Sequence, residues 1–140
     1  MNAQLAGPFE QAAAIPYRGQ GGQAEFCLIT STTTGRWGFP KGMIEPGDTP
    51  EQTALKEAAE EAGLHGVLVG EALGAFAYEK SGRRLRVLVF LMEVKRVESH
   101  WPEANRRARQ WCAPAAVRLL LGHPEQQRLF DAALKRLGAL

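Results

Sequence analysis

The sequence predicts an α/β domain in which helices pack on a central mixed β-sheet. Strand-like apolar segments lie on both sides of one strongly capped helix, and two further helix-like segments end the chain. The 140 residues include 45% hydrophobic and 23% charged residues, which is ordinary for a soluble globular protein. This length suits one compact unit, so residues 1–140 are expected to form a single domain.

The first strands are expected near the N-terminus. Ala12–Tyr17 and Glu25–Thr30 are apolar and rich in strand-forming residues, and the stretch RGQGGQ between them marks a turn. A loop, STTTGR, follows. The next stretch, WGFPKG, is expected to be extended, because Pro40 restricts Phe39 to the β region of backbone conformation.

The strongest local prediction is a helix from about Pro50 to Ala62. Thr49 suits the N-cap position, and Gln52 completes a capping box with it. Proline is favoured at the first helical position, as at Pro50. Gly63 fits the left-handed position that ends many helices.

The second half of the chain is expected to add two long strands and two helices. Val67–Ala77 and Arg83–Arg96 are strand-like, and the stretch YEKSGR between them is typical of a hairpin. Ala113–Leu121 and His123–Leu137 are helix-like, the second with apolar residues on one face. This order of elements favours a mixed sheet between helices.

Composition argues against export, membrane insertion and a disulfide framework. The N-terminal stretch lacks the basic region and long apolar core of a signal peptide. The longest apolar run, residues 85–94, is too short to span a bilayer and contains Arg86 and Glu93. We therefore predict a cytoplasmic protein without membrane contact. Cys27 and Cys112 show no metal-binding or redox spacing and are expected to be reduced core residues.

Charge is distributed unevenly along the chain. Residues 1–79 contain four Lys or Arg and ten Asp or Glu, whereas residues 80–140 contain thirteen and five. One interpretation is an anionic ligand that bridges an acidic, metal-loaded half and a basic half; the other is scattered surface charge. The basic residues show no pattern of a nucleic-acid-binding module, so no nucleic acid partner is expected.

Three carboxylates, Glu57, Glu60 and Glu61, lie close together on the predicted helix. At about 100° per residue, Glu60 lies about 60° to one side of Glu57 and Glu61 about 40° to the other. This arc is either an ordinary solvated face or a site for a hard divalent cation, which prefers oxygen ligands. Gly42 would let its backbone carbonyl approach such an ion. A stripe of apolar residues faces the other way: Ala54, Leu55, Ala58 and Ala62.

The residues from Gly42 to Leu64 resemble the signature of the Nudix hydrolases, Gly-x5-Glu-x7-Arg-Glu-φ-x-Glu-Glu-x-Gly-φ, in which φ is aliphatic. The match covers 23 residues. Asp48 stands where the family has Glu, and Lys56 stands where it has Arg. Lysine keeps the charge but lacks the planar, bidentate grip of arginine. The resemblance implies a Nudix-type α/β/α sandwich and a Mg²⁺ site for pyrophosphate hydrolysis, with Mn²⁺ as the alternative ion.

Outside this signature, AAAIPYR, EFCLITS, GRWGFPKG and WPEANRRARQW resemble the diphosphoinositol polyphosphate phosphohydrolases. Pro40–Gly42 and the EPGD after it also resemble the asymmetric dinucleoside tetraphosphate hydrolases. The diphosphoinositol branch usually has glycine where Lys41 stands. The implied partner is a small-molecule polyphosphate: a nucleoside diphosphate linked to another group, a dinucleoside polyphosphate or a diphosphoinositol polyphosphate. A homodimer is kept as one option for the assembly.

The resemblance also implies roles for individual residues. Glu60 is the favoured general base, with Glu98 and Glu103 as alternatives, and Lys56 is expected to orient the catalytic Glu57. The metal ligands are expected to be Gly42, Glu57, Glu60 and Glu61. Six basic residues are expected to bind substrate phosphates: Arg18, Arg36, Lys41, Arg84, Arg86 and Arg107.

A rival hypothesis is a non-catalytic Nudix-fold module that binds a nucleotide or another phosphorylated ligand. The intact set of three glutamates favours the enzyme, because a binding module has no need of all three. Four aromatic residues are expected either to stack on a nucleobase or to pack in the core: Trp37, Phe76, Tyr78 and Trp101.

Overall fold

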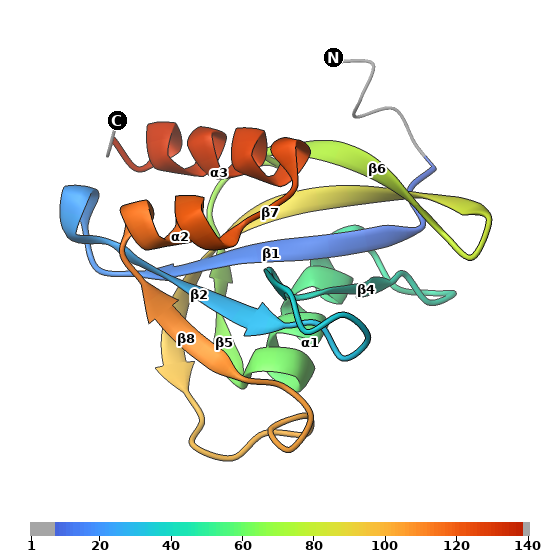
Figure 1. Ribbon diagram of the computed structural model, residues 1–140, viewed down its shortest axis with the longest axis horizontal. Coiled ribbons are helices and arrows are strands. Elements are labelled where there is room, and N and C mark those ends of the chain that lie inside the picture. Colours follow the sequence, from blue (N-terminus) through green and yellow to red (C-terminus); the bar gives the residue numbers. More distant parts are fainter. Residues whose placement is uncertain (1–7, 139–140) are drawn as a thin grey trace.

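A mixed β-sheet with helices on both faces forms the fold (Figure 1). The structure is a computed structural model, which describes residues 8–138. Its strands are β1 (Gln11–Arg18), β2 (Glu25–Thr30), β3 (Trp37–Gly38), β4 (Lys41–Met43), β5 (Leu64–Leu68), β6 (Gly74–Lys80), β7 (Arg83–Val97) and β8 (Arg109–Cys112). Its helices are α1 (Pro50–Ala62), α2 (Pro114–Leu120) and α3 (Pro124–Arg136), with a short 3-10 helix, η2 (Gly21–Gln23).

The centre of the sheet is the parallel pair β1 and β7, in register from Gln11 opposite Val87 to Tyr17 opposite Glu93. The other strand pairs are antiparallel: β2 and β4 pair with β1, β3 and β8 with β2, and β5 and β6 with β7. The predicted mixed sheet is therefore confirmed. Because β4 pairs with the start of β1, it carries Gly42 to the side of the sheet on which α1 lies.

Two apolar cores hold the layers together. The helices α2 and α3 cover one face of the sheet, where Phe26 and Phe130 meet edge to face with ring centroids 4.8 Å apart. The helix α1 covers the other face through Ala54, Ala58 and Ala62, all fully buried. These small side chains let α1 lie close to the sheet. None of the described helices is long and apolar enough to cross a membrane.

The bounds of α1 agree with the sequence prediction, and its caps explain why. The Thr49 hydroxyl accepts from the Gln52 N–H at 3.1 Å, and the Gln52 side-chain carbonyl accepts from the Thr49 N–H at 2.8 Å. Gly63 ends the helix in the left-handed region, with φ of 68°. The orientation of the three glutamates is therefore set by strong local signals at both ends of the helix.

The strand predicted over Val67–Ala77 is wrong in one respect, because the structure has two strands, β5 and β6, along the same edge of β7. Residues 69–73 leave the ladder between them, and only Val69 and Leu73 donate backbone hydrogen bonds to β7 there. Gly70 turns the chain with φ of +74°. The short strand β8 was not predicted, since its four residues carry no clear alternation.

Candidate active site

A cleft of about 1000 Å³ opens beside α1 and reaches the connection between α2 and α3. The helix α1 lines it with Glu57 and Glu61, and β4 lines it with Lys41 and Gly42. The loop at residues 31–34 adds hydroxyl groups to the lining. The cleft therefore brings the carboxylates of the signature together with basic and hydroxyl side chains.

The Glu57 carboxylate lies directly against the backbone of Gly42. A Cβ atom placed on Gly42 would lie 2.3 Å from Cδ and 2.4 Å from Oε1 of Glu57, far inside van der Waals contact. Glycine is thus what lets β4 approach this carboxylate. Burial, and then the negative charges of Glu61 and Glu60, raise the pKa of Glu57 to about 7.

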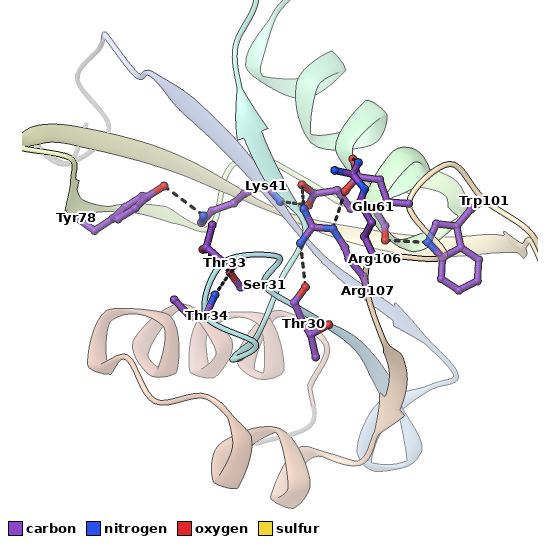
Figure 2. A network of polar contacts seen from close by, with 11 residues as sticks. Thr30, Ser31, Thr33, Thr34, Lys41, Glu61, Tyr78, Trp101, Arg106 and Arg107 are labelled. Carbon is purple, nitrogen blue, oxygen red and sulfur yellow. Dashed lines mark hydrogen bonds and ion pairs between the residues drawn. The ribbon is translucent and has the colours of Figure 1, made fainter.

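Glu61 is buried, with 6% of its surface exposed. Its Oε1 accepts from the Lys41 backbone N–H at 3.0 Å, and its Oε2 accepts from Arg107 at 2.9 Å (Figure 2). Burial raises the pKa of Glu61, while the Arg107 charge and the Lys41 N–H act in the opposite direction. A buried glutamate whose carboxylate accepts two hydrogen bonds is not part of an ordinary solvated face. The interpretation of the three glutamates as a solvated face therefore does not hold for Glu61.

The other two carboxylates are half-buried and lack such partners. Among the described residues, neither the Glu57 nor the Glu60 carboxylate makes a hydrogen bond or an ion pair. Glu57 lines the cleft. Glu60 lies on the same arc of α1 but is not among the residues that line the cleft. Glu57 and Glu60 therefore offer carboxylate oxygens that no described side chain binds directly, and such oxygens are the ligands that a hard divalent cation prefers.

The two positions that depart from the family signature contact each other. Lys56 Nζ lies 3.5 Å from Asp48 Oδ2 in a largely exposed ion pair. Lys56 makes no direct bond to Glu57, but its charge lowers the pKa of Glu57 against the larger effect of burial. Lys56 therefore acts on Glu57 only through its charge. Its long side chain pairs with Asp48, which is shorter than the glutamate of the family signature.

Arg107 is a link between three elements rather than a free cation. Its side chain is 12% exposed. Nη2 donates to Glu61, Nε donates to Glu103 Oε1 at 2.7 Å, and Nη1 donates to the Thr30 carbonyl at 2.9 Å. Although Arg107 lines the cleft, these bonds occupy its guanidinium. Sequence reasoning missed this role, because its partners lie up to 77 positions away in the chain.

Of the remaining basic residues that were predicted to bind substrate, some line the cleft and others lie outside it. Arg36 and Lys41 line the cleft, as does Lys80, whereas Arg18, Arg84 and Arg86 are outside its lining. Residues directly opposite in an antiparallel pair share a face, and Lys80 is opposite Arg83. Alternation therefore places Arg84 and Arg86 on the other face of the sheet.

Two of these outlying arginines stack on aromatic rings. The guanidinium carbon of Arg18 lies 3.9 Å from the Trp111 ring centroid, and Arg18 also pairs with Glu25 at 3.1 Å. The guanidinium carbon of Arg86 lies 4.7 Å from the centroid of the Phe9 ring. Their contacts place both arginines in packing between elements away from the cleft.

Two successive hydrogen bonds hold the Lys41 ammonium at the cleft. Lys41 Nζ donates to the Tyr78 hydroxyl at 3.2 Å and lies 4.8 Å from its ring centroid (Figure 2). The Tyr78 hydroxyl in turn donates to Gln11 Oε1 at 2.8 Å. These two hydrogen bonds hold a positive charge at the cleft that Glu57 and Glu61 also line.

The alternative general bases both have cationic partners. Glu98 pairs with Arg96 at 3.2 Å, and its Oε1 also lies 3.5 Å from His65 Nε2. Glu103 binds Arg107 at 2.7 Å and Arg106 at 3.5 Å. The Glu60 carboxylate has no such partner among residues 8–138.

The donor set fits a hard divalent cation. All of the candidate ligands are oxygen atoms, from carboxylates and the Gly42 carbonyl, as such ions require. Within residues 8–138 no three His, Cys, Asp or Glu side chains form a preassembled metal group, and Glu61 instead turns to Arg107. Burial, and then the negative charges of Glu61 and Glu60, raise the pKa of Glu57, and a cation at this carboxylate would act in the opposite direction.

This charge predicts a pH-dependent stability. The pKa of Glu57 rises from 4.5 to about 7 on folding, so its contribution to stability is present below pH 4.5 and is lost as the pH rises through 7. In chelator, Glu57→Gln should therefore have a higher melting temperature than the wild type at pH 8, and this difference should shrink below pH 4.5. Thermal melts at pH 8 and below pH 4.5 measure this difference.

Glu51→Gln, on the exposed first turn of α1, is the control and should give no gain in melting temperature. An equal gain for both variants would contradict this explanation.

Comparisons with known proteins agree on the family. The NUDIX domain model matches residues 8–133. Diphosphoinositol polyphosphate phosphohydrolase 3-alpha of Mus musculus is 31% identical over 104 residues, covering 73% of this chain and 62% of that protein. Nudix hydrolase 21, chloroplastic, of Arabidopsis thaliana is 35% identical over 138 residues, covering 94% of this chain and 69% of that protein.

The fold also matches solved structures. The C. elegans Ap4A hydrolase superposes with a TM-score of 0.76 at 22% identity, covering 91% of this chain and 96% of that one. This likeness confirms the predicted Nudix-type α/β/α sandwich. Taken with the match of the NUDIX domain model to nearly the whole described chain, it leads to one conclusion: the protein belongs to the Nudix domain family.

Proposed function

We propose that the protein is a Nudix pyrophosphohydrolase that cleaves a phosphoanhydride bond with Mg²⁺, or alternatively Mn²⁺. The observation that carries this proposal is the pair of unpartnered carboxylates, Glu57 and Glu60, beside the cleft and next to the buried Glu61. Family membership supports the reaction class. The proposal includes a cytoplasmic location and a small-molecule substrate.

The metal would be held by Gly42, Glu57, Glu60 and Glu61. When bound, it would neutralise charge on the substrate phosphates and make water a better nucleophile. Glu60, whose carboxylate has no partner among residues 8–138, would accept the proton of the attacking water. Arg107 would hold Glu61 in place. The other basic residues that line the cleft, Arg36, Lys41 and Lys80, would bind the phosphates.

The lining of the cleft favours nucleoside polyphosphates among the three substrate classes. The partly buried rings of Trp37 and Tyr78 line the same cleft as Arg36, Lys41 and Lys80. Aromatic rings suit a planar base, and a few cations suit a short phosphate chain. A densely phosphorylated inositol would call for more cations than this lining provides.

A substrate panel tests the proposal against the rival, a non-catalytic module. The purified chain is incubated with Mg²⁺ and diadenosine tetraphosphate, a nucleotide sugar or a diphosphoinositol polyphosphate, and the products are separated by ion-exchange chromatography. We expect cleavage, fastest for the nucleoside polyphosphates. Binding of these compounds without any product would favour the non-catalytic module.

Lys56→Arg restores the family residue and is expected to keep or raise activity. Arginine can still pair with Asp48 and still supplies the charge that lowers the pKa of Glu57. Lys56→Gln removes that charge and should lower kcat/KM severalfold. Steady-state kinetics of both variants measure the effect. A loss beyond roughly tenfold in Lys56→Arg, about 1.4 kcal/mol in the barrier, would mean that Lys56 has another role.

A further inference from the structure

The C-terminal end of α1 is held by residues from the connection between β7 and β8. An α-helix leaves its last four carbonyls without partners inside the helix. In α1 these belong to residues 59–62, the segment that carries Glu60 and Glu61. The Gly63 N–H covers the first of them, the Ala59 carbonyl, at 3.1 Å.

Two side chains cover the carbonyls at the very end of the helix. Trp101 Nε1 donates to the Glu61 carbonyl at 3.0 Å (Figure 2). Arg109 Nη1 donates to the Ala62 carbonyl at 2.8 Å and to the Glu98 carbonyl at 2.9 Å. The Arg109 guanidinium carbon also lies 3.9 Å from the Trp101 ring centroid. We call Trp101 and Arg109 the helix clamp.

The same connection reaches the remaining carbonyl and one carboxylate. The Glu103 N–H donates to the Glu60 carbonyl at 3.1 Å. Arg107 binds the Glu61 carboxylate itself. All four terminal carbonyls of α1 therefore have partners, three of them from residues 40 to 47 positions further along the chain.

Gly63 is needed for this arrangement in two ways. Its φ of +68° is in the left-handed region. In addition, a Cβ atom on Gly63 would lie 2.9 Å from Trp101 Cβ and 3.0 Å from Arg109 Nη1. The glycine of the family signature thus provides the space that the helix clamp occupies.

We infer that Trp101 and Arg109 are positioning residues that fix the last turn of α1 and, through it, the carboxylates of Glu60 and Glu61. Helix ends fray, and the like charges of these neighbouring glutamates push them apart. A ligand set must be held to within about 0.5 Å to act on an ion. This inference rests on the proposed function, because it assigns the clamp to the carboxylates that would hold the metal.

The alternative is a clamp that only stabilises the fold. Trp101→Phe separates the two, because phenylalanine keeps a ring for Arg109 but has no N–H for the Glu61 carbonyl. The matched control is Trp111→Phe. Trp111 carries an arginine at the same 3.9 Å, but its indole makes no hydrogen bond to α1 within the described part of the chain.

Three readouts are taken for each variant: amide hydrogen exchange of residues 60–64 in chelator, Mn²⁺ affinity by calorimetry, and steady-state kinetics. For Trp101→Phe we expect exchange about fivefold faster, the effect of losing one hydrogen bond. We also expect Mn²⁺ affinity severalfold weaker and kcat about tenfold lower with little change in KM. Trp111→Phe should leave all three readouts near the wild-type values.

A second variant, Arg109→Lys, keeps a positive charge but loses the planar guanidinium that stacks on Trp101 while its Nη1 donates to both the Ala62 and the Glu98 carbonyls, and the same changes are expected. If both clamp variants only lower the melting temperature, with wild-type exchange at residues 60–64 and wild-type Mn²⁺ affinity, the inference is overturned. If exchange and Mn²⁺ affinity change as expected while the wild type hydrolyses no substrate, the clamp stands and the proposed function fails.

Discussion

Glu60→Gln is expected to lower turnover by roughly a hundredfold or more while leaving the fold at least as stable as the wild type. Glutamine keeps the size of the side chain and has a similar helix propensity. The substitution breaks no hydrogen bond, because the Glu60 carboxylate has none within residues 8–138. It also removes one negative charge that raises the pKa of Glu57.

The measurements are a thermal melt in chelator and a turnover assay at saturating Mg²⁺. Glu51→Gln changes the same chemical group on the exposed first turn of α1 and should keep wild-type turnover. A structural role for Glu60 predicts the opposite pair of results, namely a lower melting temperature and nearly normal turnover. That pair would remove Glu60 from the proposed machinery.

Gly42→Ala is expected to reduce turnover as strongly, again with a modest effect on stability. The new Cβ atom would lie 2.3 Å from Glu57 Cδ and 2.7 Å from Glu57 Cγ, so the Glu57 side chain must move. The contacts involve only the end of a flexible side chain, so the backbone can stay in place. A displacement of about 1 Å in a reacting group costs on the order of a hundredfold in rate.

Circular dichroism, Mn²⁺ affinity and turnover measure this prediction. The control is Gly22→Ala, because a Cβ atom at Gly22 would have no neighbour within 4 Å. We expect native spectra for both variants, with weaker Mn²⁺ binding and lost activity only for Gly42→Ala. Normal turnover in that variant would show that Glu57 does not act from the position it has against Gly42.

The part of the site that could be predicted from the sequence is the part encoded locally. The helix α1 begins and ends at the predicted residues, because its capping box and Gly63 lie within a few positions of its ends. The order of the glutamates on one arc follows from helical geometry alone. The sequence indicated β1, β2 and β7 for the same reason, through continuous apolar runs.

The part that could not be predicted depends on distant residues. The Glu61 carboxylate accepts a hydrogen bond from Arg107, which is 46 positions away in the sequence. The Glu61 carbonyl accepts one from Trp101, which is 40 positions away. No local pattern distinguishes these residues from ordinary surface arginines and tryptophans. Alternation separated Arg84 and Arg86 from Arg83, but only the assembled structure shows that Lys80 lines the cleft and that Arg84 and Arg86 do not.

In the function proposed here, the glutamates of α1 hold a divalent ion that is required for hydrolysis. The most direct test is the initial rate of diadenosine tetraphosphate hydrolysis as a function of Mg²⁺ concentration, starting from protein stripped in chelator. We predict no turnover without metal, a saturable increase as Mg²⁺ is added, and a half-saturating Mg²⁺ concentration that is higher in Glu57→Gln. Full turnover in excess chelator, or the same Mg²⁺ dependence in both proteins, would contradict the claim.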